Sequence, residues 1–421
     1  MVLTYIHTMK LSDLGDISDS QKVALNNQEQ GIERHLLQNL PDIKSHALVV
    51  SGIRRCGKST LLRQFVNKLG RPYFYFNFDD IRLASFSQSD FGLLDKIIAD
   101  SSARLIFIDE IQSAENWELY VRQKLDEGYQ LVITGSNASL LSLELGTRLT
   151  GRHISKELFP FSYSEFCGFT GAEAGHKSLL DYLEKGGFPE YLKTGNTDIL
   201  TQLQSDILYR DIMGRYKLRD AASLRRLFVY LVSNPAQQFS PSKLTITAGV
   251  KSPTTVLEYI SFLEAAYLIH LLPCFAWSLK SQNLAPKKAY IADTGFIKTG
   301  SISFSKNYGA LLENFVYNSL RIKTGRYDSS IDSDIFYFTG KNGGECYFIV
   351  LPHTQPVCIQ VCWELTTDNQ DREINGLLEA MEFFNVNSGT IITFNTEDLI
   401  ETAGKKIDVI PAWKYSLFSN L

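Results

Sequence analysis

The sequence predicts an α/β fold whose first half is organised around a mostly parallel β-sheet. Short apolar runs that are typical of buried strands alternate with helical segments between residues 46 and 163. The predicted strands are HALVVSG, YFYFNF, RLIFIDE and QLVITGS, with one more near residues 152–158. Strands that alternate with helices in this way favour a parallel sheet covered by helices.

A glycine-rich loop lies between the first predicted strand and a helix. Residues 52–59 read GIRRCGKS and fit the pattern G-x-x-x-x-G-K-S/T, in the strand–loop–helix context that the pattern requires. Its glycines let backbone N–H groups close around phosphate oxygens, and the helix N-terminus adds a positive dipole end. A chance glycine turn is the alternative, which the context on both sides disfavours.

The loop therefore predicts a nucleotide-phosphate site. Lys58 is expected to reach the β- and γ-phosphates, and Ser59 to supply a hydroxyl to Mg²⁺. The residues expected to bind the nucleotide are Gly52, Ile53, Arg54, Arg55, Cys56, Gly57, Lys58, Ser59 and Thr60.

A second phosphate-site element ends the strand RLIFIDE. Asp109 is expected to hold Mg²⁺, directly or through water, and Glu110 to polarise the attacking water as a general base. Many such carboxylate pairs are only solvated strand ends, but this one follows a glycine-rich phosphate loop by some fifty residues. With one whole predicted strand between the two motifs, the order favours hydrolysing ATPases of the additional-strand class.

Three further polar side chains are candidates for completing the site. Ser136 follows the fourth strand, where such ATPases place a residue that senses the γ-phosphate; a plain strand-to-loop turn is the alternative. Arg148 and Arg152 precede the last core strand, and either could act as an arginine finger, in its own chain or from a neighbouring subunit. Both could equally be ordinary surface arginines.

Taken together, these motifs resemble those of a bacterial and archaeal group of AAA+-type ATPases. The segments that carry the resemblance occur along nearly the whole chain: Gly52–Ser59, Asp109–Gln112, Thr134–Ser136, Leu149–Arg152, Pro160–Phe166, Gly186–Leu192, Tyr209–Ile212, Lys288–Phe296 and Gly309–Leu320. The resemblance implies ATP, rather than GTP, as the nucleotide. It also implies an ATPase core, a helical lid, a winged helix, and a C-terminal domain similar to the restriction-endonuclease fold.

The expected domains follow from these features. After an N-terminal helical segment at 1–45, we expect the ATPase core at 46–163, a helical lid at 164–220 and a winged helix-turn-helix at 221–286. In the lid, GGFPEYL is expected to form a loop-like interruption. The remaining residues, 287–421, are expected to form a degenerate nuclease-like α/β domain.

The last domain departs from the nuclease pattern at the residues that would bind metal. A nuclease of that fold needs a helix glutamate, a strand aspartate and an E-x-K pair around Mg²⁺. The first is present as Glu313, but the others fall on Tyr347, Gln360 and Cys362. Amide, phenol and thiol groups do not replace carboxylates around Mg²⁺, so we expect no cleavage. A new metal site formed by Glu313, Cys358 and Cys362 is the disfavoured alternative.

Composition limits the classes of partner. The 421-residue chain has a formal net charge of −4, so nucleic acid, which is possible here, would need a local basic patch. The expected recognition helix, SPTTVLEYISFLEAAYLIH, carries glutamates and no arginine or lysine, which weighs against a major-groove reader. No apolar run is long enough for a membrane span, and no signal peptide is evident; with six scattered cysteines, a cytoplasmic location is expected.

The residues thus favour an enzyme that hydrolyses ATP with Mg²⁺ and thereby moves its other domains. The alternatives are a switch that binds ATP and turns over slowly, and a scaffold that binds nucleic acid or protein without cutting it. Glu110 favours turnover over the switch. A homo-oligomer is possible, because an arginine finger can come from a second subunit.

Overall fold

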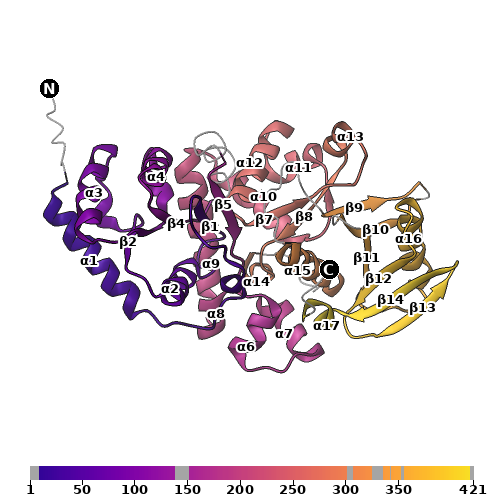
Figure 1. Cartoon of the computed structure of the whole chain (residues 1–421). Helices are drawn as coiled ribbons and strands as arrows, with labels where there is room; N and C mark the ends of the chain where they lie inside the picture. Colours follow the sequence, from indigo (N-terminus) through magenta and orange to yellow (C-terminus); the bar gives the residue numbers. More distant parts are fainter. Residues whose placement is uncertain are drawn as a thin grey trace. The chain divides into compact units, whose positions relative to one another are not determined.

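The computed structural model of the chain (Figure 1) contains two compact units, Met1–Leu158 and Phe159–Leu421. It describes residues 9–137, 151–300, 307–324, 335–341, 343–351 and 355–417. No helix within these ranges combines the length and the apolar character that a membrane span needs.

The first unit is built on a five-stranded sheet that confirms the predicted parallel α/β architecture. Its strands are β1 (Ala47–Ser51), β2 (Tyr73–Asn77), β3 (Leu105–Asp109), β4 (Gln130–Gly135) and β5 (His153–Glu157). They are all parallel and lie in the order β2-β3-β4-β1-β5. Since β4 lies between β1 and β3, the strand that precedes the glycine-rich loop is not a direct neighbour of the strand that ends in Asp109.

Helices cover both faces of this sheet. One face packs on α1 (Leu11–Asn27), α3 (Phe91–Asp100) and α4 (Trp117–Asp126) in a single apolar cluster. On the other face lies α2 (Lys58–Leu69), whose Phe65 ring meets Phe107 of β3 edge-on. Successive side chains along each strand alternate between the two faces, and both sets are apolar, as a sheet buried on both sides requires.

The N-terminal helix differs from its predicted bounds. The sequence predicts a helical segment at 1–45, but α1 ends at Asn27, and only a 3₁₀ turn at His35–Asn39 follows. The extended stretch between them places Arg34 against the glycine-rich loop. Because Leu14 and Ile17 of α1 belong to the sheet's core, the helix is an integral part of this unit.

The second unit begins with a run of helices. They are α6 (Tyr163–Thr170), α7 (His176–Lys185), α8 (Pro189–Thr194), α9 (Asp198–Ser205) and a π-helical turn at Asp206–Gly214. The expected loop at GGFPEYL is wrong in its second half, because α8 starts at Pro189, a residue well suited to the first helical position.

Three more helices and a small sheet come next. The helices are α10 (Ala221–Ser233), α11 (Pro241–Ala248) and α12 (Pro253–Ala265). Strand β6 (Gln238–Phe239) lies between α10 and α11, whereas β7 (Ile269–Leu272) and β8 (Lys287–Ile291) follow α12, and the strands pair in the order β6-β8-β7. Between β7 and β8 lies the short helix α13 (Leu279–Leu284). The sequence placed KKAYIAD in the last domain, whereas β8 pairs with the strands that surround the three helices.

The rest of the unit is a six-stranded mixed sheet with helices on both faces. The strands β9 (Ile335–Thr339), β10 (Glu345–Val350), β11 (Val357–Val361), β12 (Ser388–Thr393), β13 (Asp398–Thr402) and β14 (Lys405–Pro411) lie in the order β13-β14-β12-β11-β10-β9. One face packs on α15 (Tyr308–Thr324) and α17 (Ala412–Leu417), and the other on α16 (Gln370–Phe383). A short helix, α14 (Gly295–Gly300), follows β8.

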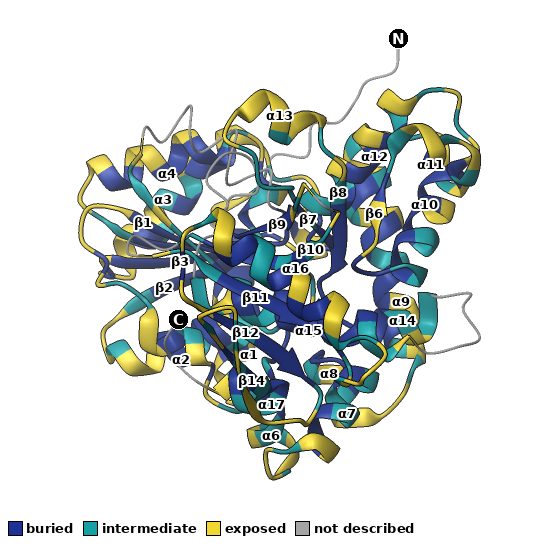
Figure 2. Ribbon diagram, turned by 90° about the vertical axis from the view of Figure 1, so that its right-hand side faces the viewer, coloured by how far each residue is buried: buried dark blue, intermediate teal, exposed yellow. Residues whose placement is uncertain are grey.

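Burial follows this layering. In Figure 2 the strands are mainly dark blue, and the exposed residues gather on the outer sides of helices and on loops. Strand β13 is mostly exposed at the sheet edge, so its residues show little of the apolar pattern that predicts a strand.

Candidate functional site

The glycine-rich loop leaves β1 in a conformation that two of its residues can adopt only without a side chain. Gly52 has φ 148°, and a Cβ atom there would lie 2.1 Å from the carbonyl oxygen of Leu158. Gly57 has φ 103° and leads directly into α2. The two glycines of the pattern are therefore explained by backbone geometry in this chain.

Arg34, which was not predicted as a site residue, is buried against the glycine-rich loop and holds it by a hydrogen bond. The Arg34 guanidinium donates a hydrogen bond of 2.7 Å to the Cys56 carbonyl, and its side chain is almost fully buried. The Arg34 backbone N–H in turn donates to the Gln64 amide oxygen of α2, at 3.1 Å. Burial raises the pKa of the Cys56 thiol, so this cysteine is a neutral part of the loop.

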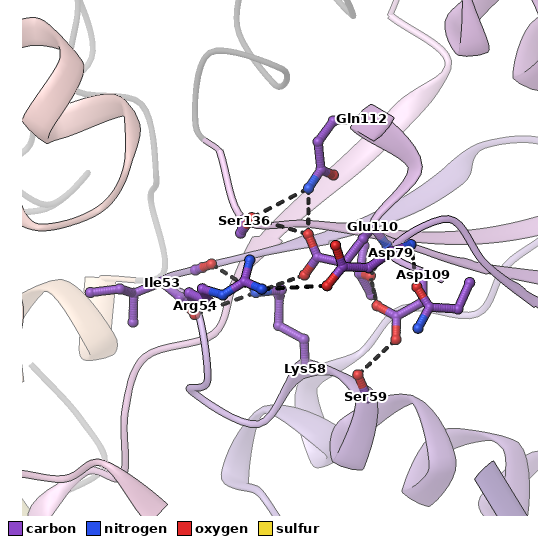
Figure 3. Close-up of polar contacts among 12 residues, drawn as sticks. Ile53, Arg54, Lys58, Ser59, Asp79, Asp109, Glu110, Gln112 and Ser136 are labelled. Carbon is purple, nitrogen blue, oxygen red and sulfur yellow. Dashed lines mark hydrogen bonds and ion pairs between the residues drawn. The ribbon is translucent and has the colours of Figure 1, made fainter. Parts of the chain in front are cut away.

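Lys58, the first residue of α2, points back into the loop (Figure 3). Its Nζ donates to the carbonyl oxygens of Gly52 (3.0 Å) and Ile53 (3.3 Å) and lies 3.4 Å from Glu110 Oε1. Burial lowers the pKa of Lys58, but Glu110 and the other nearby acidic groups outweigh burial and leave it raised. The ammonium is thus a fully charged donor at the centre of the loop.

Asp109 is held by hydroxyl groups from three different elements. Its carboxylate accepts from Ser59 Oγ of α2 (2.7 Å), from Tyr75 Oη of β2 (3.1 Å) and from Thr134 Oγ1 of β4. Burial, followed by the negative charge of Glu110, raises the pKa of Asp109. A carboxylate in this position gains from an added cation, because none of these three partners carries positive charge.

Glu110 occupies the turn after β3 and faces Lys58. Its φ of 50° is unusual for a residue with a side chain. Its Oε2 accepts from Ser136 Oγ (3.0 Å) and from the Gln112 amide, and its backbone N–H donates to Thr134 Oγ1 (3.1 Å). Burial raises the pKa of Glu110, but Lys58, Gln112 and Ser136 together bring it below the usual value, so Glu110 is ionised at neutral pH.

The parallel sheet explains why these groups meet. The loop, the Asp109–Glu110 pair and Ser136 all follow the carboxyl ends of strands (β1, β3 and β4), and carboxyl ends of parallel strands share one edge of a sheet. The turn after β2 reaches the same edge, where Asp79 forms an ion pair of 3.4 Å with Arg54. Ser51, at the end of β1, aligns with Gly135 at the end of β4.

The structure does not bring the expected arginine finger to this edge. Arg152 precedes β5 at the amino edge of the sheet, where its carbonyl accepts from Ala47 N–H at 3.0 Å and its guanidinium pairs with Asp126. The length of β1, at about 3.3 Å per residue, puts roughly 16 Å between Arg152 and the loop of its own chain. Arg148 lies outside the described residues.

Four site residues were not recognised in the sequence: Arg34, Tyr75, Gln112 and Thr134. Tyr75 and Thr134 lie within apolar strands, where a single hydroxyl gives no signal of its role. Gln112 belongs to the DEIQ motif, so only the motif pointed to it. Of the expected nucleotide-binding residues, Arg55 is exposed, whereas Thr60, in α2, is half-buried like Ser59.

The candidates in the second unit lie around the C-terminal sheet. Glu313 of α15 accepts from Lys288 Nζ (3.0 Å) and Tyr290 Oη (2.8 Å). Gln360 of β11 donates to Glu373 of α16 at 2.6 Å and accepts from the Tyr347 backbone N–H at 3.2 Å. Tyr347 and Cys362 line one pocket together with Glu313, so the structure brings three of the four candidates together.

Comparison with known families agrees with the first site. Residues 44–167 match the model of an AAA domain (AAA_14), and residues 176–301 match a domain of unknown function, DUF8612. The AAA match supports an AAA+-type ATPase. The second match crosses the expected boundaries at 220 and 286, and the whole six-stranded sheet lies beyond it.

Relatives extend over the whole chain. The uncharacterized protein MJ1544 of Methanocaldococcus jannaschii is 32% identical over 428 residues, covering 94% of this chain and 95% of its own. An uncharacterized protein of Haemophilus influenzae is 29% identical and covers 72% of this chain and 81% of its own. At this identity and coverage, the chain belongs to the same family as the M. jannaschii protein.

Solved structures are more distant. AMPPCP-bound DnaA from Aquifex aeolicus is 16% identical, covers 59% of this chain and 88% of its own, and has a TM-score of 0.28. The RuvB Holliday junction branch migration motor from Thermotoga maritima is 16% identical, covers 62% and 89%, and has a TM-score of 0.28. TM-scores this low carry no argument about arrangement or function.

The contacts of Thr134 lead to a prediction about stability. Thr134→Val keeps the side-chain shape but removes a donor to Asp109 and an acceptor for the Glu110 N–H, which should cost about 2–3 kcal/mol in the free energy of unfolding. Thr134→Ser keeps the hydroxyl and loses one methyl group, which should cost about 1 kcal/mol. Urea-induced unfolding measures both, and a valine variant as stable as the serine variant would contradict these hydrogen bonds.

Proposed function

We propose that the protein is an ATPase that binds Mg·ATP at the glycine-rich loop and hydrolyses it with Glu110 as general base. The observation that carries the proposal is the convergence of Lys58, Ser59, Asp109 and Glu110 at one sheet edge, although they come from two segments some fifty residues apart. The AAA-domain match over residues 44–167 supports the same interpretation.

The residues fit a nucleotide phosphate and its metal. A Cβ at Gly52 would collide with the backbone, so the loop is shaped by the bare backbone that a phosphate cradle uses. The Ser59 hydroxyl and the Asp109 carboxylate are oxygen ligands of the kind Mg²⁺ prefers, and they already lie 2.7 Å apart. When bound, Mg²⁺ neutralises charge on the phosphates.

Within the chain, each side chain then has a defined task. Lys58 supplies positive charge for the phosphates. In this structure its ammonium group contacts the loop carbonyls and Glu110. Ser136 and Gln112 fix Glu110 by hydrogen bonds to the same oxygen, so the other oxygen is oriented toward Lys58. Because its pKa is lowered, Glu110 is ionised at neutral pH and can accept a proton from water held beside it.

Glu110→Gln separates binding from turnover. The amide can still hydrogen-bond water but cannot take its proton, so hydrolysis should fall by about 10²–10⁴-fold. Affinity for Mg·ATP should be equal to the wild-type affinity or higher, because Lys58 loses an internal anion that competes with phosphate. Calorimetric titration and phosphate release measure the two quantities.

The matched control is Glu115→Gln, an exposed glutamate five residues along the chain, which should change neither quantity. Equal turnover in Glu110→Gln and the wild type would assign the base to another residue. Wild-type turnover too slow to measure, with normal Mg·ATP binding, would favour the slow switch over the enzyme.

Arg152 can serve the site only from another copy of the chain, because it lies at the far edge of its own sheet. We therefore predict that mixing Arg152→Ala with Glu110→Gln restores part of the activity that each variant lacks alone, since one copy then supplies the arginine and another the base. Hydrolysis per protomer should also rise with protein concentration. Arg122→Ala, an exposed arginine in α4, is the control. No restoration, together with a monomer by light scattering, leaves Arg152 as a partner of Asp126.

Motion of the second unit is the proposed output of hydrolysis. The helices at 163–214, the three-helix and small-sheet segment at 221–291 and the C-terminal sheet are proposed to act as lid, winged helix and binding domain. Contact with nucleic acid through α12 is not favoured, since that helix carries the exposed Glu258 and no lysine or arginine. The protein is proposed to work in the cytoplasm.

We propose further that the C-terminal sheet has a nuclease-like fold without nuclease chemistry. Among the described residues no three His, Cys, Asp or Glu side chains are grouped as metal ligands. Burial raises the pKa of the Cys362 thiol to about 12, so no thiolate is present at neutral pH. Pure protein with Mg²⁺ or Mn²⁺ should leave plasmid DNA and RNA intact; cleavage that disappears in Glu313→Ala would contradict this.

A further inference from the structure

A pocket of about 420 Å³ lies between α15, α16 and the ends of β10 and β11 in the second unit. Its size falls within the range of about 300–1,000 Å³ that small-molecule sites occupy. The AAA-domain match does not include it, and the DUF8612 match includes only Gln237 of its lining residues. The pocket is therefore separate from the nucleotide site and from what the family models describe.

The pocket is lined by more negative than positive charge. Glu313, Glu364 and Glu373 line it, and Arg372 is the one cation among the described lining residues. The Lys288 ammonium forms ion pairs with both Glu313 and Glu345. In this described part of the chain, four carboxylates thus face two cations, and an incoming group that carries positive charge would reduce the imbalance.

One of these carboxylates has an oxygen without a partner. Glu313 is only 8% exposed, and both of its hydrogen bonds, from Lys288 and Tyr290, go to Oε1. Within the described residues Oε2 accepts no hydrogen bond, although Glu313 is part of the pocket wall. Burial raises the pKa of Glu313 in spite of Lys288, which means that the charged form lacks stabilisation that a ligand can supply.

The neighbouring side chains suit a cationic head on an apolar stem. Tyr347 also lines the pocket, and its hydroxyl, which makes no hydrogen bond within the described residues, can accept from an N–H group. Val361 and Trp363 form an apolar part of the wall. The Trp363 ring is stacked on Phe394 at 4.1 Å, so the wall is held in place.

A cationic ligand in the pocket would compete with Arg372 for the negative charge of its wall. Its guanidinium donates twice to Glu373 Oε1, yet its side chain is 76% exposed, while Glu373 is buried and keeps a second bond from Gln360. The exposed Arg372 side chain can rearrange, and the buried Glu373 carboxylate would then need another cation, which a ligand can supply. The one cation of the described wall is therefore replaceable.

We propose that this pocket binds an organic cation, an ammonium or guanidinium group on an aliphatic stem, with the charged head on Glu313 and the stem against Val361 and Trp363. The same chemistry can come from a free small molecule or from a lysine or arginine side chain of a partner protein. This proposal does not depend on ATP binding, so it is tested independently of the proposed nucleotide site.

The test uses isosteric pairs that differ in charge. n-Butylguanidinium and n-butylurea represent a free ligand, and the tripeptide amides acetyl-Gly-Arg-Gly and acetyl-Gly-citrulline-Gly represent a side chain. Calorimetric titration of the full-length protein should show binding of each guanidinium probe and at least about tenfold weaker binding of each urea probe, since a urea can donate a hydrogen bond to Glu313 but brings no positive charge. If the arginine peptide binds more tightly than n-butylguanidinium, the natural ligand is a side chain of a partner protein. If n-butylguanidinium binds more tightly, it is a free small molecule.

Two variants should shift the affinity in opposite directions. Glu313→Gln removes the buried charge and should weaken guanidinium binding at least about tenfold. Arg372→Gln removes the competing cation and should strengthen it about two- to fivefold. The controls are Glu401→Gln on the exposed strand β13 and Arg225→Gln on α10, which should change nothing.

The proposal is overturned if neither guanidinium probe binds the folded wild-type protein at millimolar concentration, or if the urea probes bind equally well. It is also overturned if Arg372→Gln weakens binding. Should Glu313→Gln fail to fold, the urea comparison and the exposed Arg372 position still decide the question. Loss of ATP hydrolysis in Glu110→Gln has no bearing on these titrations.

Discussion

A buried aspartate, a buried lysine and a partly buried glutamate meet at the same edge of the first sheet, and the neighbouring polar groups compensate their charges. An unpaired charge in a low-dielectric site costs several kcal/mol, so each must be neutralised or hydrogen-bonded. Lys58 and Glu110 neutralise one another, whereas Asp109 receives neutral hydroxyl donors. The resulting network joins β2, β3, β4 and α2, so the chemistry of the site and the packing of the sheet cannot be separated.

The sequence predicted the parts of this site that lie in continuous motifs. The loop pattern gave Lys58 and Ser59, and the strand ending in two carboxylates gave Asp109 and Glu110, because both patterns couple residue type to position along the chain. Ser136 followed from its place after the fourth strand, and it does lie against Glu110. The roles of all these residues remain proposals, but their convergence is a fact of the structure.

What the sequence did not predict depends on contacts between distant segments. Arg34 looked like part of a helix and instead lies in extended chain against Cys56. Tyr75 and Thr134 lie in strands whose apolar neighbours dominate the pattern. The same reason accounts for KKAYIAD, whose pairing with β6 and β7 is decided by partners that local sequence does not reveal. Arg152 lies at the amino edge of its own sheet, which the sequence did not indicate, since sequence proximity does not say which edge of a sheet a residue faces.

The first glycine of the phosphate loop has a mechanical consequence for the chain as a whole. Gly52 approaches the carbonyl of Leu158, and the Leu158 N–H donates to Ser51 at 2.7 Å, so the last residue of the first unit is clamped to the start of the loop. Phe159, the next residue, already belongs to the second unit. The chain therefore leaves the first unit beside the start of the glycine-rich loop, and any substitution at Gly52 would disturb the backbone at this point.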